Sequence, residues 1–228
     1  MTKRPKKPKF TRLIMLSGGI DSTFLLAQAL RETEDLVLVH HVHLINLEGR
    51  HRAEAHACKK IVEYCRRNYR DFVYTESTVD RSGLYAMGYD VITVASEAGI
   101  AATNHLLETG GMADFWMLGF NLEEAHDAEE ENDEVGLSAS GDQAAQRPAT
   151  NRLPYILAAI AATCFPNAPP KYLRPILQPK RELMDYMGQD LVDLCWTCRR
   201  PVRTDQGFHE CGECKTCKLM ISIRDNKS

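Results

Sequence analysis

Short apolar runs alternate along the chain with longer segments in which apolar residues recur every three or four positions. The first pattern is typical of buried strands in a parallel sheet, and the second of helices that cover such a sheet. The sequence therefore predicts an α/β, Rossmann-like fold with a parallel sheet and helices on both faces. The expected strands are 13–16, 36–44, 71–74, 115–120 and 174–177, and the expected helices follow Gly19, cover 51–68, 92–107 and 152–164, and start again near Lys180.

Two segments fall outside this pattern. Residues 1–12 are crowded with lysine and arginine, which predicts a flexible basic arm. Residues 123–147 are acidic and hold too little apolar surface to pack, which predicts a mobile loop. The expected organisation is thus the arm 1–12, an α/β domain 13–190 and a cysteine-rich tail 191–228.

Length and composition favour an intracellular enzyme. The 228 residues and 44% hydrophobic content suffice for one sizeable core with an appendage. No run of eighteen apolar residues and no signal-peptide core is present, so we expect a cytoplasmic protein without membrane contact. With a net charge of −3, nucleic acid is not expected as a partner in the main reaction; a homodimer is an open expectation.

A glycine turn between the first strand and the first helix carries the strongest chemical signal. Two glycines let the backbone approach a ligand, and the first N–H groups of the helix favour an anion such as phosphate. Serine hydroxyls add donors, and an aspartate there is suited to hold Mg²⁺ beside phosphate oxygens. The alternative is an ordinary serine-capped turn. The expected ATP-binding residues are Leu16, Ser17, Gly18, Gly19, Ile20, Asp21 and Ser22.

Five of the eight cysteines gather near the C-terminal end, at Cys195, Cys198, Cys211, Cys214 and Cys217. Two consecutive two-residue spacers let thiolates converge on one tetrahedral ion, for which Zn²⁺ is the first expectation. Disulfides and an iron–sulfur cluster are the alternatives, although nothing indicates secretion. Because a tetrahedral site takes four ligands, one cysteine should be spare.

The order of these motifs resembles that of the QueC-like 7-cyano-7-deazaguanine synthases, in the PP-loop ATP pyrophosphatase superfamily. The likeness rests on SGGIDS at 17–22, EGRH at 48–51, the segment from Gly119 to Glu123, WTC at 196–198 and CGECKTC at 211–217. It implies a fold of the adenine nucleotide alpha hydrolase type, with ATP, Mg²⁺ and Zn²⁺ as cofactors. The implied zinc ligands are Cys198, Cys211, Cys214 and Cys217, which leaves Cys195 as the spare.

The reaction implied by this resemblance belongs to queuosine biosynthesis. ATP adenylates the carboxylate of 7-carboxy-7-deazaguanine, ammonia displaces AMP to give an amide, and a second activation yields the nitrile. The implied catalytic residues are Ser17, Asp21, Ser22, Arg50 and His51. The implied substrate-binding residues are Gly119, Asn121, Glu123 and Glu124.

Two stretches depart from the family pattern. Residues 94–99 stand where a PGRN-like motif is expected, and residues 125–130 stand where a YPDCR-like segment is expected. Activation of an acceptor by ATP is therefore a firmer prediction than the identity of the acceptor. The alternatives are a ligase that activates a different carboxylate, a PP-loop thiolation enzyme that modifies tRNA, and a non-catalytic zinc-knuckle binding module.

The remaining polar signals have simpler interpretations. His40, His41 and His43 lie on one predicted strand, where alternate residues face opposite ways, so they are expected to pack and not to bind one metal. Three further cysteines are expected in helix cores, at Cys58, Cys65 and Cys164. Trp196 is expected to pack the cysteine knuckle against the domain.

Overall fold

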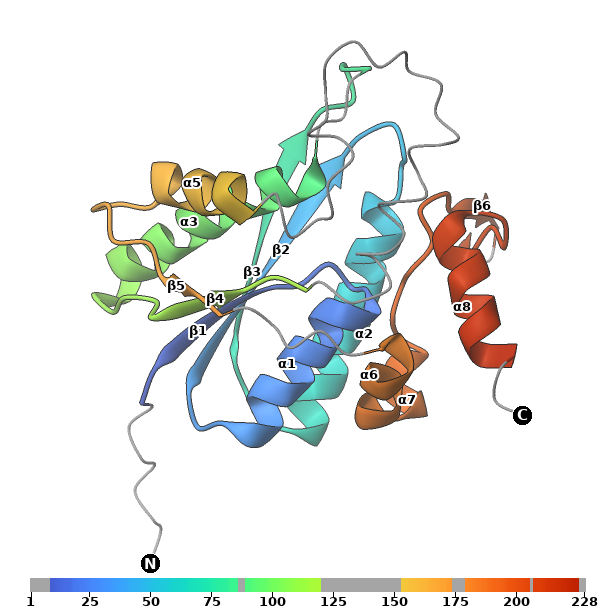
Figure 1. Cartoon of the computed structure of the whole chain (residues 1–228), viewed down its shortest axis with the longest axis horizontal. Helices are drawn as coiled ribbons and strands as arrows, with labels where there is room; N and C mark the ends of the chain where they lie inside the picture. The colour runs from blue at the N-terminus through green and yellow to red at the C-terminus, as the bar shows by residue number, and fades with distance from the viewer. Residues whose placement is uncertain (1–8, 86–88, 120–152, 174–178, 206, 226–228) are drawn as a thin grey trace, which may run out of the picture.

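The computed structural model describes residues 9–85, 89–119, 153–173, 179–205 and 207–225 (Figure 1). At its centre lies a five-stranded sheet in the order β3-β2-β1-β4-β5, and every neighbouring pair in it is parallel. This confirms the predicted α/β fold. The strands are β1 (Thr11–Met15), β2 (Leu36–Ile45), β3 (Val73–Asp80), β4 (Phe115–Met117) and β5 (Lys171–Tyr172).

Helices cover both faces of the sheet, as the alternation of side chains along a strand requires (Figure 1). On β1, Ile14 packs with helices α1 (Ile20–Glu32) and α2 (His51–Asn68) on one face. Its neighbour Leu13 packs on the other face with the helices α3 (Asp90–Thr109) and α5 (Leu153–Thr163). Both side chains are fully buried, and each burial stabilises the fold by roughly 1.5–3 kcal/mol.

The C-terminal tail packs on the same face as α1 and α2. After α6 (Lys180–Met187) it forms α7 (Gln189–Val192), a small antiparallel pair β6 (Val202–Thr204) and β7 (Gly207–His209), and α8 (Lys215–Asp225). Leu191 and Met220 are buried in one cluster with core residues of α1 and α2. The tail therefore shares the main core.

The sheet differs from the expectation at its edges. β3 runs to Asp80 instead of ending at residue 74, and its residues are mostly exposed, because it is an edge strand without a buried apolar run. β4 ends at Met117 instead of residue 120. The last strand of this sheet is the two-residue β5, whereas the predicted strand 174–177 lies wholly outside the described residues.

Residues 1–8 of the predicted basic arm 1–12 and the acidic stretch 123–147 also lie outside the described residues, whereas Thr11 and Arg12 belong to β1. Within the part of the chain that the structure describes, no helix combines the length and the apolar character that a membrane crossing requires.

Candidate active site

The glycine loop, residues 16–22, follows β1 at the point where the strand order reverses. β2 and β3 lie on one side of β1, and β4 and β5 lie on the other. In open parallel sheets, ligands bind at this switch point, outside the carboxyl ends of the strands. The sequence thus folds its strongest anion-binding motif into the position where such a fold binds ligands.

The glycine at the apex of this loop has no room for a side chain. Gly18 has φ +82°, a left-handed conformation that L side chains rarely adopt. A Cβ placed on it would lie 3.1 Å from the carbonyl oxygen of Glu54 and 3.2 Å from Cys58 Sγ. The loop therefore rests directly on α2, and a glycine is required at this position.

The two serine hydroxyls of the loop face one another. Their Oγ atoms are 3.0 Å apart, and the Ser17 N–H donates to Ser22 Oγ at 3.1 Å. The Gly19 N–H donates to Ser17 Oγ at 3.3 Å. Two hydroxyls, held in place by these N–H groups, are thus gathered at the beginning of α1, where the first N–H groups of a helix add donors for a phosphate.

The end of β4 meets the same loop. A Cβ on Gly119 would lie 2.8 Å from the backbone nitrogen of Ser22 and 2.9 Å from Asp21 Cβ, so Gly119 packs against the first turn of α1. The structure therefore places this predicted residue beside the glycine loop. The other predicted substrate-binding residues, Asn121, Glu123 and Glu124, lie outside the described residues.

Lys180 is a site residue that the sequence reasoning missed, because it was considered only as the start of a helix. Its side chain is 3% exposed, and its Nζ lies 3.4 Å from Asp21 Oδ2 in the glycine loop. Lysine is almost never buried without a partner, and a cation at a helix N-terminus opposes the helix dipole. That unfavourable position at the first residue of α6 is the signal that could have found it.

Arg50 joins three segments beside the glycine loop. Its guanidinium contacts Glu48 Oε2 at 2.7 Å and Glu54 Oε1 at 3.2 Å, and it also bonds to Asp90 at the start of α3. Burial raises the pKa of Glu54, and the adjacent Arg50 opposes that rise. The guanidinium therefore stabilises a cluster of carboxylates, while its predicted contact with a nucleotide stays a prediction.

His51 begins α2. Burial lowers its pKa, and the neighbouring Arg52 lowers it further, so the ring is neutral at pH 7. Its buried Nδ1 has no hydrogen-bond partner among the described residues. A neutral imidazole with an unused nitrogen can bind a polar ligand, but its predicted catalytic role stays a prediction.

The three strand histidines do not converge on one point, in agreement with the sequence analysis: the rings of His41 and His43 contact one another, with centroids 4.6 Å apart, and His40 lies on the other face. His40 contacts Thr75 Oγ1 at 2.8 Å and Ser77 Oγ at 3.0 Å on β3. His41 faces the other way, where its Nδ1–H donates to the Leu16 carbonyl at 2.8 Å. Burial lowers the pKa of His41 to about 4, so a neutral ring fixes the start of the glycine loop.

The tail is bonded to the glycine loop through Trp196. The backbone N–H of Trp196 donates to the Gly18 carbonyl at 2.8 Å, and the indole N–H donates to the Cys198 carbonyl at 2.8 Å. Trp196 therefore connects the loop with the cysteine cluster, a closer coupling than the expected packing of a knuckle on the domain.

Four cysteines converge in the tail: Cys198, Cys211, Cys214 and Cys217 have all their sulfur atoms within 4.8 Å of one another. Backbone N–H groups of Arg200 and Cys211 each donate to Cys198 Sγ at 3.3 Å, which stabilises a thiolate. Cys195 lies outside this group; its half-buried thiol donates to the Leu191 carbonyl at 3.5 Å, and desolvation raises its pKa to about 12. The predicted set of four ligands and one spare thus matches the arrangement of the sulfurs.

The fold and the loop at its switch point define the class of protein, an α/β protein with a candidate phosphate-binding loop and a four-cysteine cluster. No protein-family profile matches the chain, and no curated protein matches its sequence. Among solved structures, the chain is similar to the U34-tRNA thiolase NcsA from Methanococcus maripaludis with its [4Fe-4S] cluster. The TM-score is 0.50 at 15% identity, over 98% of this chain and 68% of that chain, a likeness of fold.

Proposed function

We propose that this chain is a PP-loop enzyme that uses ATP to adenylate a carboxylate, with 7-carboxy-7-deazaguanine as the acceptor and ammonia as the second substrate. The observation that carries the proposal is the glycine loop at the switch point. Its two hydroxyls and its helix N-terminus suit the pyrophosphate of ATP, and Asp21 beside them suits Mg²⁺.

The proposed chemistry starts from a carboxylate, which is a poor electrophile until one oxygen becomes a leaving group. The acceptor oxygen attacks the α-phosphate of ATP, and the bond to the β-phosphate breaks. Ser17, Ser22 and the N–H groups of α1 stabilise the charge on the departing pyrophosphate. Mg²⁺ held by Asp21 would supply further charge stabilisation when bound.

Ammonia then attacks the acyl adenylate, and AMP leaves as the amide forms. In the second round the amide oxygen attacks the α-phosphate of ATP and is adenylated. The C–O bond then breaks, so that this oxygen leaves as part of AMP, and loss of the two amide protons gives the nitrile. Lys180 would support both rounds, because its ion pair holds the Asp21 carboxylate in place from the first adenylation to the second.

The cysteine cluster is proposed to hold Zn²⁺ as a structural ion. A tetrahedral Zn–S distance of roughly 2.3 Å corresponds to sulfur atoms about 3.8 Å apart. Cys211 Sγ and Cys217 Sγ are 3.9 Å apart, which fits one ion. An iron–sulfur cluster needs wider spacing, because each thiolate then binds a separate iron.

A thiolation reaction on tRNA is the second candidate, favoured by the likeness of fold to a U34-tRNA thiolase. Such a reaction needs a reactive sulfur near the activated group. Cys195 is the cysteine nearest in sequence to the loop-bonded Trp196, yet burial raises its pKa to about 12, which makes its thiol a weak nucleophile. This observation supports the ligase over the thiolase.

The test combines the purified protein with ATP, Mg²⁺, ammonium and 7-carboxy-7-deazaguanine, and follows the products by mass spectrometry. We expect AMP and pyrophosphate together with the amide and then the nitrile. Release of ADP and phosphate alone would contradict adenylation. AMP formation with another carboxylate, but not with this acceptor, would retain the activation step and reject the deazapurine.

Lys180→Met gives a separate prediction for the loop. The change keeps the chain length but leaves Asp21 without its buried cation, so we expect a loss of about 3 kcal/mol in the free energy of unfolding. Saturating Mg²⁺ and ATP should recover part of this loss, since the ion takes over as the partner of Asp21. Urea unfolding with and without ligand measures both effects. Lys218→Met, at an exposed position on α8, is the control and should change neither.

A further inference from the structure

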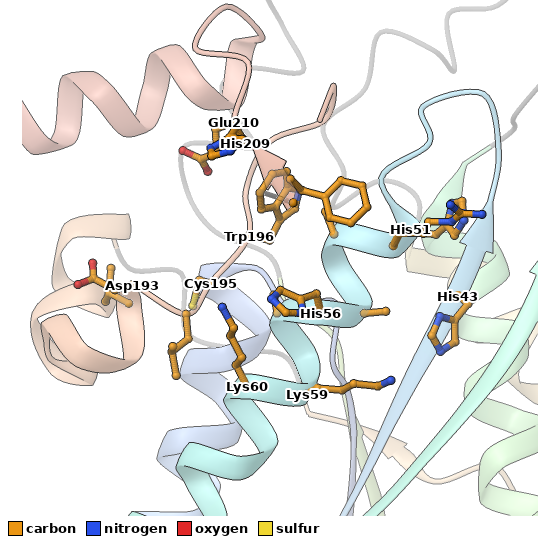
Figure 2. Close-up of a pocket in the computed structure, with 18 of the residues that line it drawn as sticks. His43, His51, His56, Lys59, Lys60, Asp193, Cys195, Trp196, His209 and Glu210 are labelled. Atoms are coloured by element: carbon orange, nitrogen blue, oxygen red, sulfur yellow. The ribbon is translucent and has the colours of Figure 1, made fainter. Parts of the chain in front are cut away.

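A cleft of about 830 Å³ opens between α2 and the tail (Figure 2). One wall is the outer face of α2, and the opposite wall is the tail segment with Cys195 and Trp196, continued by Phe208 on β7. The cleft adjoins the glycine loop, because a Cβ on Gly18 would lie 3.2 Å from Ala57, which lines the cleft.

The α2 wall is a stripe of cationic and imidazole side chains. Arg52, His56, Lys59 and Lys60 recur at helical spacing and are all exposed. Figure 2 shows His56 and Lys60 on the side of α2 that faces the tail, whereas Lys59 extends to the other side of the helix, toward His43. Within the described part of the chain, no carboxylate forms an ion pair with Arg52, Lys59 or Lys60, so their charges are available to a ligand.

The acidic groups of the opposite wall are already engaged. Asp193 Oδ1 accepts a hydrogen bond from Gln189 at 2.6 Å, and Glu210 accepts one from Thr197 at 2.8 Å. Glu210 also lies 3.9 Å from Arg224, a further cation of the cleft lining. The lining holds four cationic side chains against the two carboxylates of Asp193 and Glu210, so the cleft carries an excess of positive charge although the whole chain has a net charge of −3.

Aromatic side chains complete the cleft. Trp196 and Phe208 are half-buried and line the wall that faces the cations. A basic groove with aromatic side chains is the arrangement by which proteins hold single strands, because the cations follow the phosphates while unpaired bases stack on the rings.

We propose that this cleft binds single-stranded nucleic acid, with the phosphates along the α2 stripe and a base against Phe208. The stripe from Arg52 to Lys60 extends about 12 Å along the helix. This length is greater than the width of a single phosphate group, so it suits a chain of successive phosphates. A strand held there would lie beside the glycine loop. The proposal does not depend on the acceptor assigned above.

The test measures binding of labelled single-stranded oligo-uridylate to the full chain, without ATP, over a series of salt concentrations. We expect the double variant Lys59→Glu and Lys60→Glu to bind at least tenfold more weakly. Its salt dependence should become shallower, by about 0.7 in the logarithmic slope for each phosphate that the variant no longer neutralises. Phe208→Leu keeps an apolar side chain without a π face and should cost about tenfold.

The matched control is the double variant Arg67→Glu and Lys218→Glu, which makes the same change in charge at exposed positions outside the cleft. It should bind as the parent does. Equal weakening in both double variants, no weakening in the cleft variant, or no binding by the parent at low salt would each overturn the proposal. Full displacement of the strand by equimolar tripolyphosphate would also overturn it, since the site would then hold a small anion. Because ATP is absent, these outcomes are independent of AMP formation.

Discussion

Asp21→Asn is expected to slow the release of AMP and pyrophosphate by about a hundredfold or more, with the fold retained at a lower unfolding midpoint, because the change also breaks the ion pair with the buried Lys180. The substitution keeps the size of the side chain but removes the charge that suits Mg²⁺ and that pairs with Lys180 at 3.4 Å. Preorganised charge at the departing phosphates is usually the largest single contribution to such a reaction, and removing one donor commonly costs about this factor. Initial rates of AMP and pyrophosphate formation measure the effect.

The control is Asp185→Asn, which makes the same chemical change at an exposed position of α6. It should leave both the rate and the urea-unfolding midpoint unchanged. If Asp21→Asn turned over at the parent rate, the glycine loop would not be the site of ATP cleavage. If its unfolding midpoint fell steeply, the rate would have to be remeasured well below that midpoint before it could be interpreted.

The loop itself was predictable from sequence because its requirements are local. Gly18 needs φ > 0 and contact with α2, and the two serines need only the turn between a strand and a helix to face one another. The central strands were predictable for a related reason. β1 and β2 are largely buried on both faces, and each is marked by a run of four apolar residues, 13–16 and 36–39.

What the sequence could not predict depends on contacts between distant segments. Lys180 reaches Asp21 across more than 150 residues, and Trp196 reaches Gly18 over a similar span. No local sequence pattern encodes such pairs. The one local sign was Lys180 itself, a cation at the start of a helix, where the helix dipole is unfavourable to positive charge. The predicted length of the edge strand β3 was too short, because its exposed residues are held in the sheet by hydrogen bonds to β2 and show no apolar run.

The histidine strand shows both situations. The period of two correctly separated His40 from His41, because opposite faces of a strand cannot share a ligand. The hydrogen-bond partner of each histidine was not predictable, because it is supplied by the neighbouring elements. β3 offers hydroxyls to His40, whereas the start of the glycine loop offers a carbonyl to His41.

Cys217→Ser is expected to release the bound metal and to lower the stability of the whole chain. The four sulfurs lie within 4.8 Å of one another, so the loss of one leaves an incomplete tetrahedral site. A structural zinc site contributes folding free energy directly, on the order of 10 kcal/mol in isolated zinc-finger peptides, and the shared core should reduce this to several kcal/mol here. Metal analysis and thermal unfolding, with and without chelator, measure the two effects.

Cys195→Ser is the matched control, because Cys195 is a tail cysteine outside the cluster and a serine hydroxyl can still donate to the Leu191 carbonyl. It should keep one metal per chain. Equal metal loss in the two variants would show that the proposed ligand set is wrong. Iron absorbance in the parent protein would show that the four cysteines bind an iron–sulfur cluster and not Zn²⁺. Since Trp196 connects the cluster to Gly18, loss of metal should also slow AMP formation at temperatures where the chain is still folded. A full rate in the metal-free variant would mean that the glycine loop keeps its geometry without the tail.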